Sequence, residues 1–399
     1  MIKGGVSKLS NKTTNDLSII IPVYNTEKYI EKCLNSVLKN IPQNTEVLVI
    51  NDGSPDNSEY IIKKFEKRYS GILKYYKKEN GGLSDTKNYG ISKSTGKYIT
   101  FVDSDDYVDS NMHKEMLALA LKEDADVIYC DVEQVFDDGH TIYSHCTNIK
   151  RKDDFFRLID TPLMATSCNK LVKKELYDIV KFPVGLNNED VAITPILIAK
   201  AKKICKIDKP FYKYYQRAGS IQNNTFNEKR FVIFDTAKIC FEYSKTLPEK
   251  LQLQIKTSLY THQILALLIY PISDLSKKEQ EHLIPIFCKK INTMFGDDFY
   301  KNSYVKSFLI DLHRKHLLSL IKKEDTKNII KWLSIYKKYD KMINFFEKVK
   351  NSIKIFFIKT KNKVVWFIKK LISLPKILLR KTKTLFRIIF NKFKNKSKD

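Results

Sequence analysis

Three carboxylates stand close together in the stretch 99-ITFVDSDDYVD-109. An apolar run typical of a buried strand ends at Val102, and Asp103, Asp105 and Asp106 follow within four positions. Carboxylates this close repel one another, and burying them is costly unless a cation lies among them. Mg²⁺ and Mn²⁺ favour oxygen ligands, commonly one or two carboxylates together with substrate phosphates. The stretch therefore predicts a divalent cation whose other ligand is a diphosphate, with Asp106 as a cap for the next turn.

Two other polar clusters directly follow apolar runs. Tyr24-Asn25 comes after the run 17–23, and the residues NDGS at 51–54 come after the run 47–50. In open α/β sheets, ligands bind in the crevice outside the carboxyl ends of the strands. Each cluster alone is well explained as a turn or a helix cap, but three of them together indicate one ligand site.

The turn after the first apolar run argues against a dinucleotide site. Such a site needs the pattern G-x-G-x-x-G, so that a helix N-terminus can hold the pyrophosphate. Residues 22–27 read PVYNTE and contain no glycine, and the chain has no P-loop. A phosphorylated ligand therefore needs another positive group, which a cation held by Asp103 or Asp105 supplies.

Two hydrophobic periods alternate over the first 130 residues and must position these clusters. Short apolar runs of strand type are separated by apolar residues at helical spacing. In one predicted helix Tyr60, Ile61, Phe65 and Tyr69 share a face. This alternation predicts right-handed βαβ units and an α/β fold with a mostly parallel central sheet flanked by helices. We expect strands at 17–23, 47–50, 72–76, 98–102 and 126–130, and helices at 29–37, 60–69 and 112–121.

The later residues change in character. The spacing of apolar residues from about 225 to 340 predicts helices, and the sequence from 341 onward consists mainly of lysines among large apolar residues. We therefore predict an α/β domain over 1–222, a helical domain over 223–340 and a basic amphipathic tail over 341–399.

The cysteines and the N-terminal residues predict a cytoplasmic location. Seven cysteines are spread along the chain without a C-x-x-C pair, as is typical of reduced thiols, and the seven histidines show no zinc-ligand spacing. No apolar segment of signal-peptide type precedes a cleavage site, and no uncharged apolar run reaches the 18 residues typical of a transmembrane helix.

Much of the positive charge lies in the tail. The chain has 71 Lys and Arg against 45 Asp and Glu, a net charge of +26, and residues 341–399 hold 18 of the cations and two of the acids. The segment 341–394 is typical of interfacial amphipathic helices, interrupted at Pro375, and predicts binding to an anionic membrane surface. Packing of the apolar face on this chain or on another copy is the alternative. The high apolar content and the dominance of lysine argue against nucleic acid as the partner.

Four stretches together resemble a known family. They read SIIIPVYNTEKYIEKCLNSVL at 18–38, VINDGSPDNS at 49–58, NGGLSDTKNYGISKSTGKYITFVDSDD at 80–106 and NNEDVAI at 187–193. In order and spacing they are similar to the family 2 glycosyltransferases with the GT-A fold, over roughly residues 17–222. The resemblance implies an inverting transferase that uses a nucleotide-diphospho-sugar, commonly with Mn²⁺ or Mg²⁺, in the synthesis of bacterial surface polysaccharides or wall polymers. It implies a UDP-sugar as donor and a glycan or lipid-linked acceptor. We expect the helical domain to be a platform for the acceptor, although its sequence contains no motif for this role.

The resemblance also implies roles for the residues that bind the donor. Asp52 would accept a hydrogen bond from the nucleobase, Asp103 would contact the ribose and the donor sugar, and Asp105 would bind the metal. The remaining donor residues would be Pro22 and Tyr24 along the base, Asn80 and Lys87 near the base and phosphates, and Arg217 and Ser220 over the diphosphate. The family usually has Ala-Arg-Asn where this chain has Thr86-Lys87-Asn88, so the bidentate fork of arginine is missing while the positive charge is kept.

On the acceptor side, the resemblance makes Asp190 of the pair Glu189-Asp190 the catalytic base. A hydroxyl is a poor nucleophile at neutral pH, and a positioned carboxylate that takes its proton helps. The pair is equally suited to open a helix that starts near Val191. We expect the enzyme to work on the inner face of the cell membrane. Two other functions fit parts of the pattern: a nucleotidyltransferase, whose Gly-rich N-terminal signature is absent, and a non-catalytic membrane scaffold that keeps the fold.

Overall fold

The computed structural model describes residues 15–146, 165–216, 226–302, 305 and 312–338. The contacts of the backbone divide the chain into two units, Met1–Pro271 and Ile272–Asp399. The predicted tail, 341–399, lies outside the described residues, and the predicted boundary between residues 222 and 223 remains a prediction.

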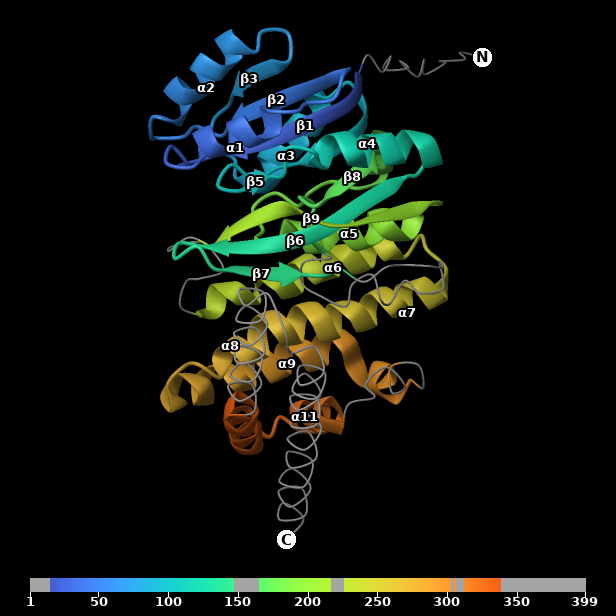
Figure 1. The fold of residues 1–399 in the computed structure, drawn as a ribbon. Coiled ribbons are helices and arrows are strands. Elements are labelled where there is room, and N and C mark those ends of the chain that lie inside the picture. The colour runs from blue at the N-terminus through green and yellow to red at the C-terminus, as the bar shows by residue number, and fades with distance from the viewer. Residues whose placement is uncertain (1–14, 147–164, 217–225, 303–304, 306–311, 339–399) are drawn as a thin grey trace, which may run out of the picture. The chain divides into compact units, whose positions relative to one another are not determined.

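Four parallel strands form the first half of the sheet in the first unit (Figure 1). They are β1 (Asn15–Val23), β2 (Thr45–Asn51), β3 (Leu73–Lys77) and β4 (Gly96–Phe101), in the spatial order β3-β2-β1-β4. In register, Val23 lies beside Asn51, and Ile20 lies beside Phe101. β1 and β2 are buried on both faces from Leu17 and Thr45 onward, as parallel strands between helices must be. The α/β prediction is confirmed, and so is the alignment of the three strand ends.

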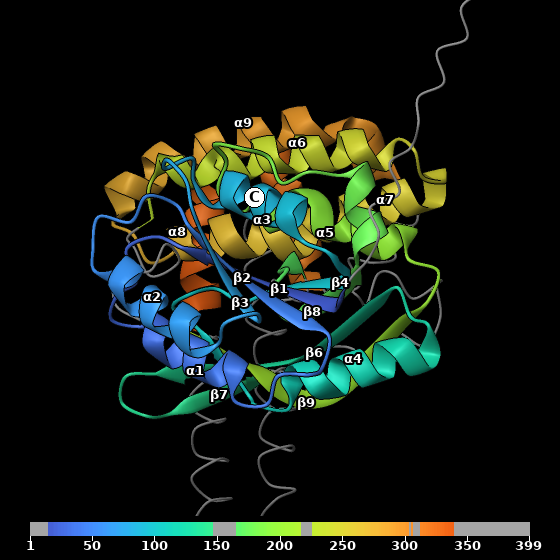
Figure 2. The same ribbon diagram turned by 90° about the horizontal axis from the view of Figure 1, so that it is seen from above.

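Helices cover both faces of these strands (Figure 2). α1 (Ile30–Leu38), α2 (Ser58–Arg68) and α4 (Met112–Glu123) pack on one core, which includes Ile19, Ile21, Val47 and Val49. α3 (Leu83–Lys93) packs on the opposite face of β1 and β2. It approaches so closely that a Cβ atom at Gly90 would lie 2.5 Å from Ile20 Cγ2. A side chain at position 90 would therefore push α3 away from β1.

The second half of the sheet is mixed in direction. β8 (Lys170–Lys173) pairs antiparallel with both β4 and β6 (Val127–Phe136), and β6 runs parallel to β9 (Ile204–Gln216). β9 also pairs with β5 (Tyr107–Val108), and β7 (Thr141–Ser144) pairs with β6. The strand predicted at 126–130 thus extends to Phe136. Its second part was missed because it is half-exposed and lacks a continuous apolar run.

The predicted face of α2 is confirmed for Phe65, which is buried, and for Ile61 and Tyr69, which pack partly buried against the core, but it is wrong for Tyr60. The buried residues are Ser58, Ile62 and Phe65, whereas Tyr60 is 65% exposed. Ile61 and Ile62 are adjacent and both apolar, so the spacing could not decide which of them faces the core.

Helices complete the first unit. η3 (Lys174–Ile179) and α5 (Glu189–Lys200) precede β9, and η4 (Glu228–Phe231), α6 (Val232–Ser244) and α7 (Glu249–Ser258) follow it. The residues Leu259–Ile269, predicted as helix, form η5, an 11-residue π-helix. α5 packs on α6, and α6 on α7. All seven cysteines of the chain lie in the described residues, and none of them forms a disulfide there.

The second unit is helical in its described part. α8 (Tyr270–Ile272) crosses its boundary, and α9 (Lys277–Lys301), α11 (Leu312–Lys322) and helical residues 326–338 lie within it. Ser276 begins α9 with a capping box in which its hydroxyl accepts from the Glu279 amide. None of the described helices is long and apolar enough to cross a membrane.

His113 provides a test of how α4 packs against the sheet. α4 contacts β6 and β9 and buries His113, whose Nε2 finds no hydrogen-bond partner among the described residues. Burial lowers the pKa of the imidazole to about 4. Because the folded protein binds this proton less readily than the unfolded chain, stability is complete above the unfolded pKa of about 6.5 and is lost as pH falls towards 4. At pH 5 the loss is about 2 kcal/mol.

Denaturant unfolding at pH 7.5 and pH 5 measures this loss. The variant His113→Met removes the titrating group, so the free energy of unfolding should fall less between the two pH values than in the unchanged protein. His282→Gln, at an exposed histidine of α9, is the matched control. An equal fall in the His113→Met variant and the unchanged protein would show that His113 is not buried in its neutral form.

Candidate active site

Asp52 ties together the loops after β2 and β3. Its buried carboxylate accepts hydrogen bonds from Lys78 Nζ at 2.6 Å, from the Gly81 amide at 2.9 Å and from the Gly82 amide at 2.8 Å. Lys78 also forms an ion pair of 2.7 Å with Asp85. Both carboxylate oxygens of Asp52 are therefore engaged by the loop that leads into α3. Its predicted bond to a nucleobase remains a prediction.

The other predicted base-binding residues surround this loop. Pro22 is buried in β1 beside Ile50, while Tyr24, directly after the strand, is 51% exposed. Gly53 adopts a φ of +68°, and a Cβ atom there would lie 3.2 Å from the backbone nitrogen of the exposed Asn80. Glycine at position 53 thus lets two loops from neighbouring strands come together at the edge where the sequence predicted a ligand.

Asp103 stands at the end of β4 among like charges. Burial raises the pKa of its carboxyl to about 7, although the Lys87 ammonium acts in the opposite direction. Three neighbouring carboxylates add to the rise, namely Asp105, Asp190 and Glu189. Negative charge therefore exceeds positive charge around Asp103 in the described structure.

Such an excess fits a divalent cation. Asp103 and Asp105 are both partly exposed, so their oxygens can reach a ligand from solution. Carboxylate oxygens are the donor type that Mg²⁺ and Mn²⁺ prefer. The predicted metal ligand Asp105 thus lies in a suitable place, and its role remains a prediction.

Asp106 and Tyr212 fix the turn that carries these carboxylates. The Asp106 side chain is buried and accepts hydrogen bonds from Tyr212 Oη at 2.6 Å and from the Tyr215 amide at 2.8 Å. The same Tyr212 oxygen accepts a bond of 3.2 Å from the Asp103 amide. Burial, together with Asp103 and Asp105, raises the pKa of Asp106 well above its usual range. Asp106, expected to cap the next turn, in fact joins that turn to β9.

Lys87 lies in the middle of the site with its ammonium enclosed. Nζ donates to Glu189 Oε1 at 2.7 Å, to Asp190 Oδ1 at 3.0 Å and to Ser167 Oγ at 3.0 Å. Burial alone lowers the pKa of this ammonium, but the charges of Asp190 and Glu189 outweigh it and hold the pKa well above its usual value. The structure therefore gives Lys87 different partners from the phosphates that the resemblance implies.

Glu189 and Asp190 begin α5, as both the catalytic and the helix-opening interpretations expect. Asp190 Oδ2 accepts a hydrogen bond of 3.0 Å from the Ser167 amide, so each of its oxygens has a fixed partner. The Asp190 side chain is 20% exposed and that of Glu189 is 8% exposed. Burial raises the pKa of Glu189, with Lys87 opposing the rise. Asp190 is thus the member of the pair that a solute can reach more easily.

Sequence reasoning missed two residues of this arrangement, Ser167 and Tyr212, and gave Asp106 a capping role alone. Ser167 and Tyr212 come from segments without a motif, and only the pairing of β8 with β4 and of β9 with β5 and β6 brings them to the site. Arg217 and Ser220, predicted over the diphosphate, lie outside the described residues.

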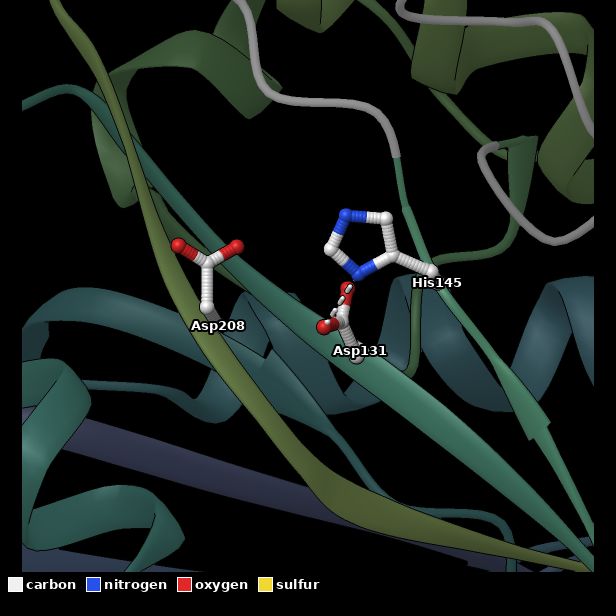
Figure 3. Close-up of side chains that lie close together, drawn as sticks. All are labelled: Asp131, His145 and Asp208. Carbon is white, nitrogen blue, oxygen red and sulfur yellow. Dashed lines mark hydrogen bonds and ion pairs between the residues drawn. The ribbon is translucent and has the colours of Figure 1, made fainter. Parts of the chain in front are cut away.

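A second group of possible metal ligands consists of Asp131 on β6, His145 directly after β7 and Asp208 on β9 (Figure 3). One ligand atom each from Asp131, His145 and Asp208 lie within 4.8 Å of one another. However, the Lys206 ammonium already pairs with Asp131 at 2.9 Å and with Asp208 at 2.6 Å. The buried Asp131 also accepts from Tyr143 Oη. A resident ammonium supplies the positive charge here, so this group ties β6 to β9 without needing a metal.

Comparisons with known proteins agree on one family. The sequence model described as Glycosyl transferase family 2 matches residues 18–180. Glycosyltransferase GlyG of Streptococcus pneumoniae is 31% identical over 224 residues, which are 53% of this chain and 74% of GlyG. The Minor teichoic acid biosynthesis protein GgaB of Bacillus subtilis is 26% identical over 288 residues, which are 69% of this chain. The chain spans only 32% of the length of GgaB.

Among solved structures, residues 1–349 of TarS from S. aureus share the fold. The crystal structure of that protein in complex with UDP-GlcNAc matches with a TM-score of 0.62 and 22% sequence identity. The match covers 81% of this chain and 92% of that one. It confirms the predicted GT-A architecture followed by helices.

The Tyr212 hydroxyl is open to a direct test. In Tyr212→Phe the ring remains, but the buried Asp106 carboxylate loses a donor and the Asp103 amide loses an acceptor. Leaving such groups without partners costs about 1–3 kcal/mol. We expect this fall in the free energy of unfolding at pH 7.5, measured with denaturant. Tyr60→Phe, at an exposed tyrosine, should change it by at most about 0.5 kcal/mol; an equal effect in both variants would contradict the assigned bonds.

Proposed function

The chain belongs to the family 2 glycosyltransferases, and from this we propose that it moves a sugar from a nucleotide-diphospho-sugar to an acceptor hydroxyl with inversion at the anomeric carbon. The observation that carries the proposal is the pair of carboxylate sites around Lys87. Asp103 lies two residues after the end of β4, and Asp190 lies in the first turn of α5. Both carboxylate oxygens of Asp190 accept hydrogen bonds, and its side chain is partly exposed. The charges of the two carboxylates act on each other, so the two sites are neighbours.

In the proposed reaction Asp190 is the base for the acceptor. As the acceptor oxygen attacks the anomeric carbon, its proton passes to the Asp190 carboxylate. The bond from that carbon to the diphosphate breaks, and the nucleoside diphosphate leaves with the electron pair. A positioned base of this kind contributes typically ~10²–10⁴-fold to the rate.

The donor is proposed to be a UDP-sugar. The TarS complexes with UDP-GlcNAc and UDP support this choice, since that protein shares the fold. Pro22, Tyr24, Asp52 and Asn80 would then face the nucleoside, and Asp103 the ribose and sugar. Arg217 and Ser220 would cover the diphosphate.

A divalent cation, Mn²⁺ or Mg²⁺, is proposed to be held by Asp105 beside Asp103. When bound, it offsets the negative charge that develops on the leaving diphosphate. The chain's own contribution is to hold the two carboxylates on a turn fixed by Asp106 and Tyr212.

The acceptor is proposed to be a glycan or lipid-linked intermediate of a bacterial surface polysaccharide or wall polymer. The similarity to a teichoic acid biosynthesis protein supports this class. Residues 341–394 would bind the anionic inner face of the cell membrane, which carries such acceptors, and residues 223–340 would provide a platform. The basic amphipathic sequence supports the membrane proposal.

Asp190→Asn tests the proposed base. The amide is nearly isosteric but cannot take a proton, so transfer from labelled UDP-sugars in the presence of Mn²⁺ should fall at least ~100-fold. Binding of UDP, measured by calorimetry, should change little, because the donor groups are untouched. Asp178→Asn, at an exposed aspartate of η3, is the matched control and should keep full activity.

Three results would contradict the proposed function: turnover in the Asp190→Asn variant close to that of the unchanged protein, no effect of a chelator, or no transfer from any nucleotide-sugar by the unchanged protein.

Liposome flotation of the full chain tests the membrane proposal. We expect the protein to float with vesicles that contain anionic lipid and to be released by high salt, because each lysine near the surface contributes on the order of 1 kcal/mol and salt screens it. Neutral vesicles are the control. A protein that stays in the vesicle-free fractions in both cases would leave packing of the tail as the explanation of its sequence.

A further inference from the structure

The Lys87 ammonium has no hydrogen-bonding capacity left for a ligand in this structure. A lysine ammonium carries three N–H donors and no acceptor. All three point at protein atoms, since Ser167 Oγ, Glu189 Oε1 and Asp190 Oδ1 each lie within 3.0 Å of Nζ. The side chain is 2% exposed. A diphosphate would have to displace one of these partners to reach the ammonium.

Aromatic rings enclose the same ammonium. Nζ lies 5.5 Å from the centroid of Phe101 and 5.0 Å from that of Phe182. Asn88, the next residue of α3, holds the backbone of Phe182 with two hydrogen bonds, donating to its carbonyl at 2.8 Å and accepting from its amide at 3.0 Å. Charge interactions are stronger in such an apolar enclosure than in water. The position of the cation is therefore set by the packing of the protein.

Lys87 and Ser167 together fix both oxygens of Asp190. Lys87 holds Oδ1, the Ser167 amide holds Oδ2, and the Ser167 hydroxyl accepts from Lys87, which closes a triangle of three residues. A carboxylate held at both oxygens cannot rotate about its last bond without losing a partner. Glu189, on the far side of the ammonium, balances its charge and is less exposed than Asp190.

We propose that Lys87 is the positioning residue of the base Asp190, and that it serves the acceptor side of the site instead of binding the donor diphosphate. This inference rests on the function proposed above. It adds a role for the lysine that stands where the resembling family has arginine. A single ammonium can point its donors in three separate directions, whereas the guanidinium fork of arginine is planar.

The placement of Lys87 on α3 links this role to the donor. The helix starts at Leu83, directly after Gly82, whose amide is held by Asp52. Lys87 follows five residues after Gly82, about 7.5 Å along a helix at 1.5 Å per residue. The loop 78–82, which Asp52 binds, therefore leads into the same helix that carries Lys87 in its second turn.

Charged and titratable groups from several elements interact electrostatically with Lys87 or with Asp190. They are Asp103 after β4, Cys168 before β8, Lys170 on β8 and Tyr177 in η3, in addition to Glu189 on α5 itself. Of these, Glu189 is the one that shares the Lys87 ammonium with Asp190. Loss of the Lys87 charge should therefore act mainly by increasing the repulsion between the carboxylates of Glu189 and Asp190.

The variant Lys87→Met tests the proposal in the full chain. Methionine keeps an unbranched side chain but removes the charge and the three donors, so the two carboxylates repel each other and bind protons at higher pH. We expect kcat to fall about 100-fold at pH 7, while KM for the UDP-sugar and the Kd of UDP stay within about twofold, since neither rests on this ammonium. The acid limb of the plot of kcat against pH should move up by about one unit.

Two further variants make the test specific. Lys93→Met, the same substitution at an exposed lysine of the same helix, should leave kcat, KM and the pH profile unchanged. The double variant Lys87→Met with Glu189→Gln removes one of the repelling charges, so its acid limb should return towards that of the unchanged protein. A purely structural role of Lys87 would not produce this return.

The proposal is overturned if Lys87→Met raises the Kd of UDP more than tenfold with kcat kept at saturating donor, because Lys87 would then bind phosphate. An acid limb of the plot of kcat against pH that does not move overturns the proposal too.

If the Lys87→Met variant does not fold, Ser167→Ala tests the proposal in its place. This substitution removes one acceptor of the ammonium but keeps the hydrogen bond from the backbone amide to Asp190, and we expect kcat to fall several-fold with an unchanged Kd of UDP. An unchanged kcat in that variant would refute the proposal. If Asp190→Asn is fully active, the proposed function itself fails; if it is inactive while Lys87→Met keeps kcat and pH profile, this inference alone fails.

Discussion

The buried ion pairs of Lys87 hold the two halves of the site together. Lys87 belongs to α3, and its partners Glu189 and Asp190 lie about one hundred residues later, at the beginning of α5. Burying an ammonium or a carboxylate alone costs several kcal/mol, so neither helix can take its place stably without the other. Two carboxylates, one hydroxyl and two aromatic rings satisfy this cation. Whatever lies on α3 is thereby fixed relative to α5.

The loop 78–82, between β3 and α3, illustrates the consequence. Asp52 binds the amides of Gly81 and Gly82 just before α3, and Gly90 lets α3 lie directly against Ile20 of β1. The close packing at Gly90 and the ion pairs of Lys87 together leave α3 little freedom to shift. The edge formed by the ends of β1, β2 and β4 and the carboxylate of Asp190 thus belong to one arrangement, which would hold Asp190 as precisely as its proposed role as a base requires.

Continuous apolar runs and helical spacing predicted the parallel half of the sheet, because β1, β2 and β4 are largely buried and the four strands follow one another in the sequence. The mixed half could not be predicted in the same way: β6 is half-exposed beyond Val132, and β8 and β9 reach the sheet by long-range pairing. Asp103, Asp105 and Asp190 could be named because they stand in motifs. Ser167 and Tyr212 could not, since their roles depend on which atoms the fold brings to them. That the Lys87 ammonium meets Ser167, Glu189 and Asp190 likewise follows from the fold and from no local pattern.

The ion pairs of Lys87 leave Asp103 and Asp106 without an ion pair to a lysine in the part of the chain that the structure describes, which favours a bound cation at their turn. Lys87 is committed to Glu189 and Asp190, and among the described residues neither Asp103 nor Asp106 forms an ion pair with a lysine or arginine. Hydroxyl and amide groups hold Asp106, and its pKa is raised by burial and by its neighbours. Partly buried carboxylates this close together destabilise the turn, and binding a cation or protonating one of the carboxyls reduces their repulsion. In the proposal that Lys87 serves the acceptor side, the negative charge of this turn is left to the proposed metal or to protonation of a carboxyl, and this links the proposed metal to the proposed position of the base.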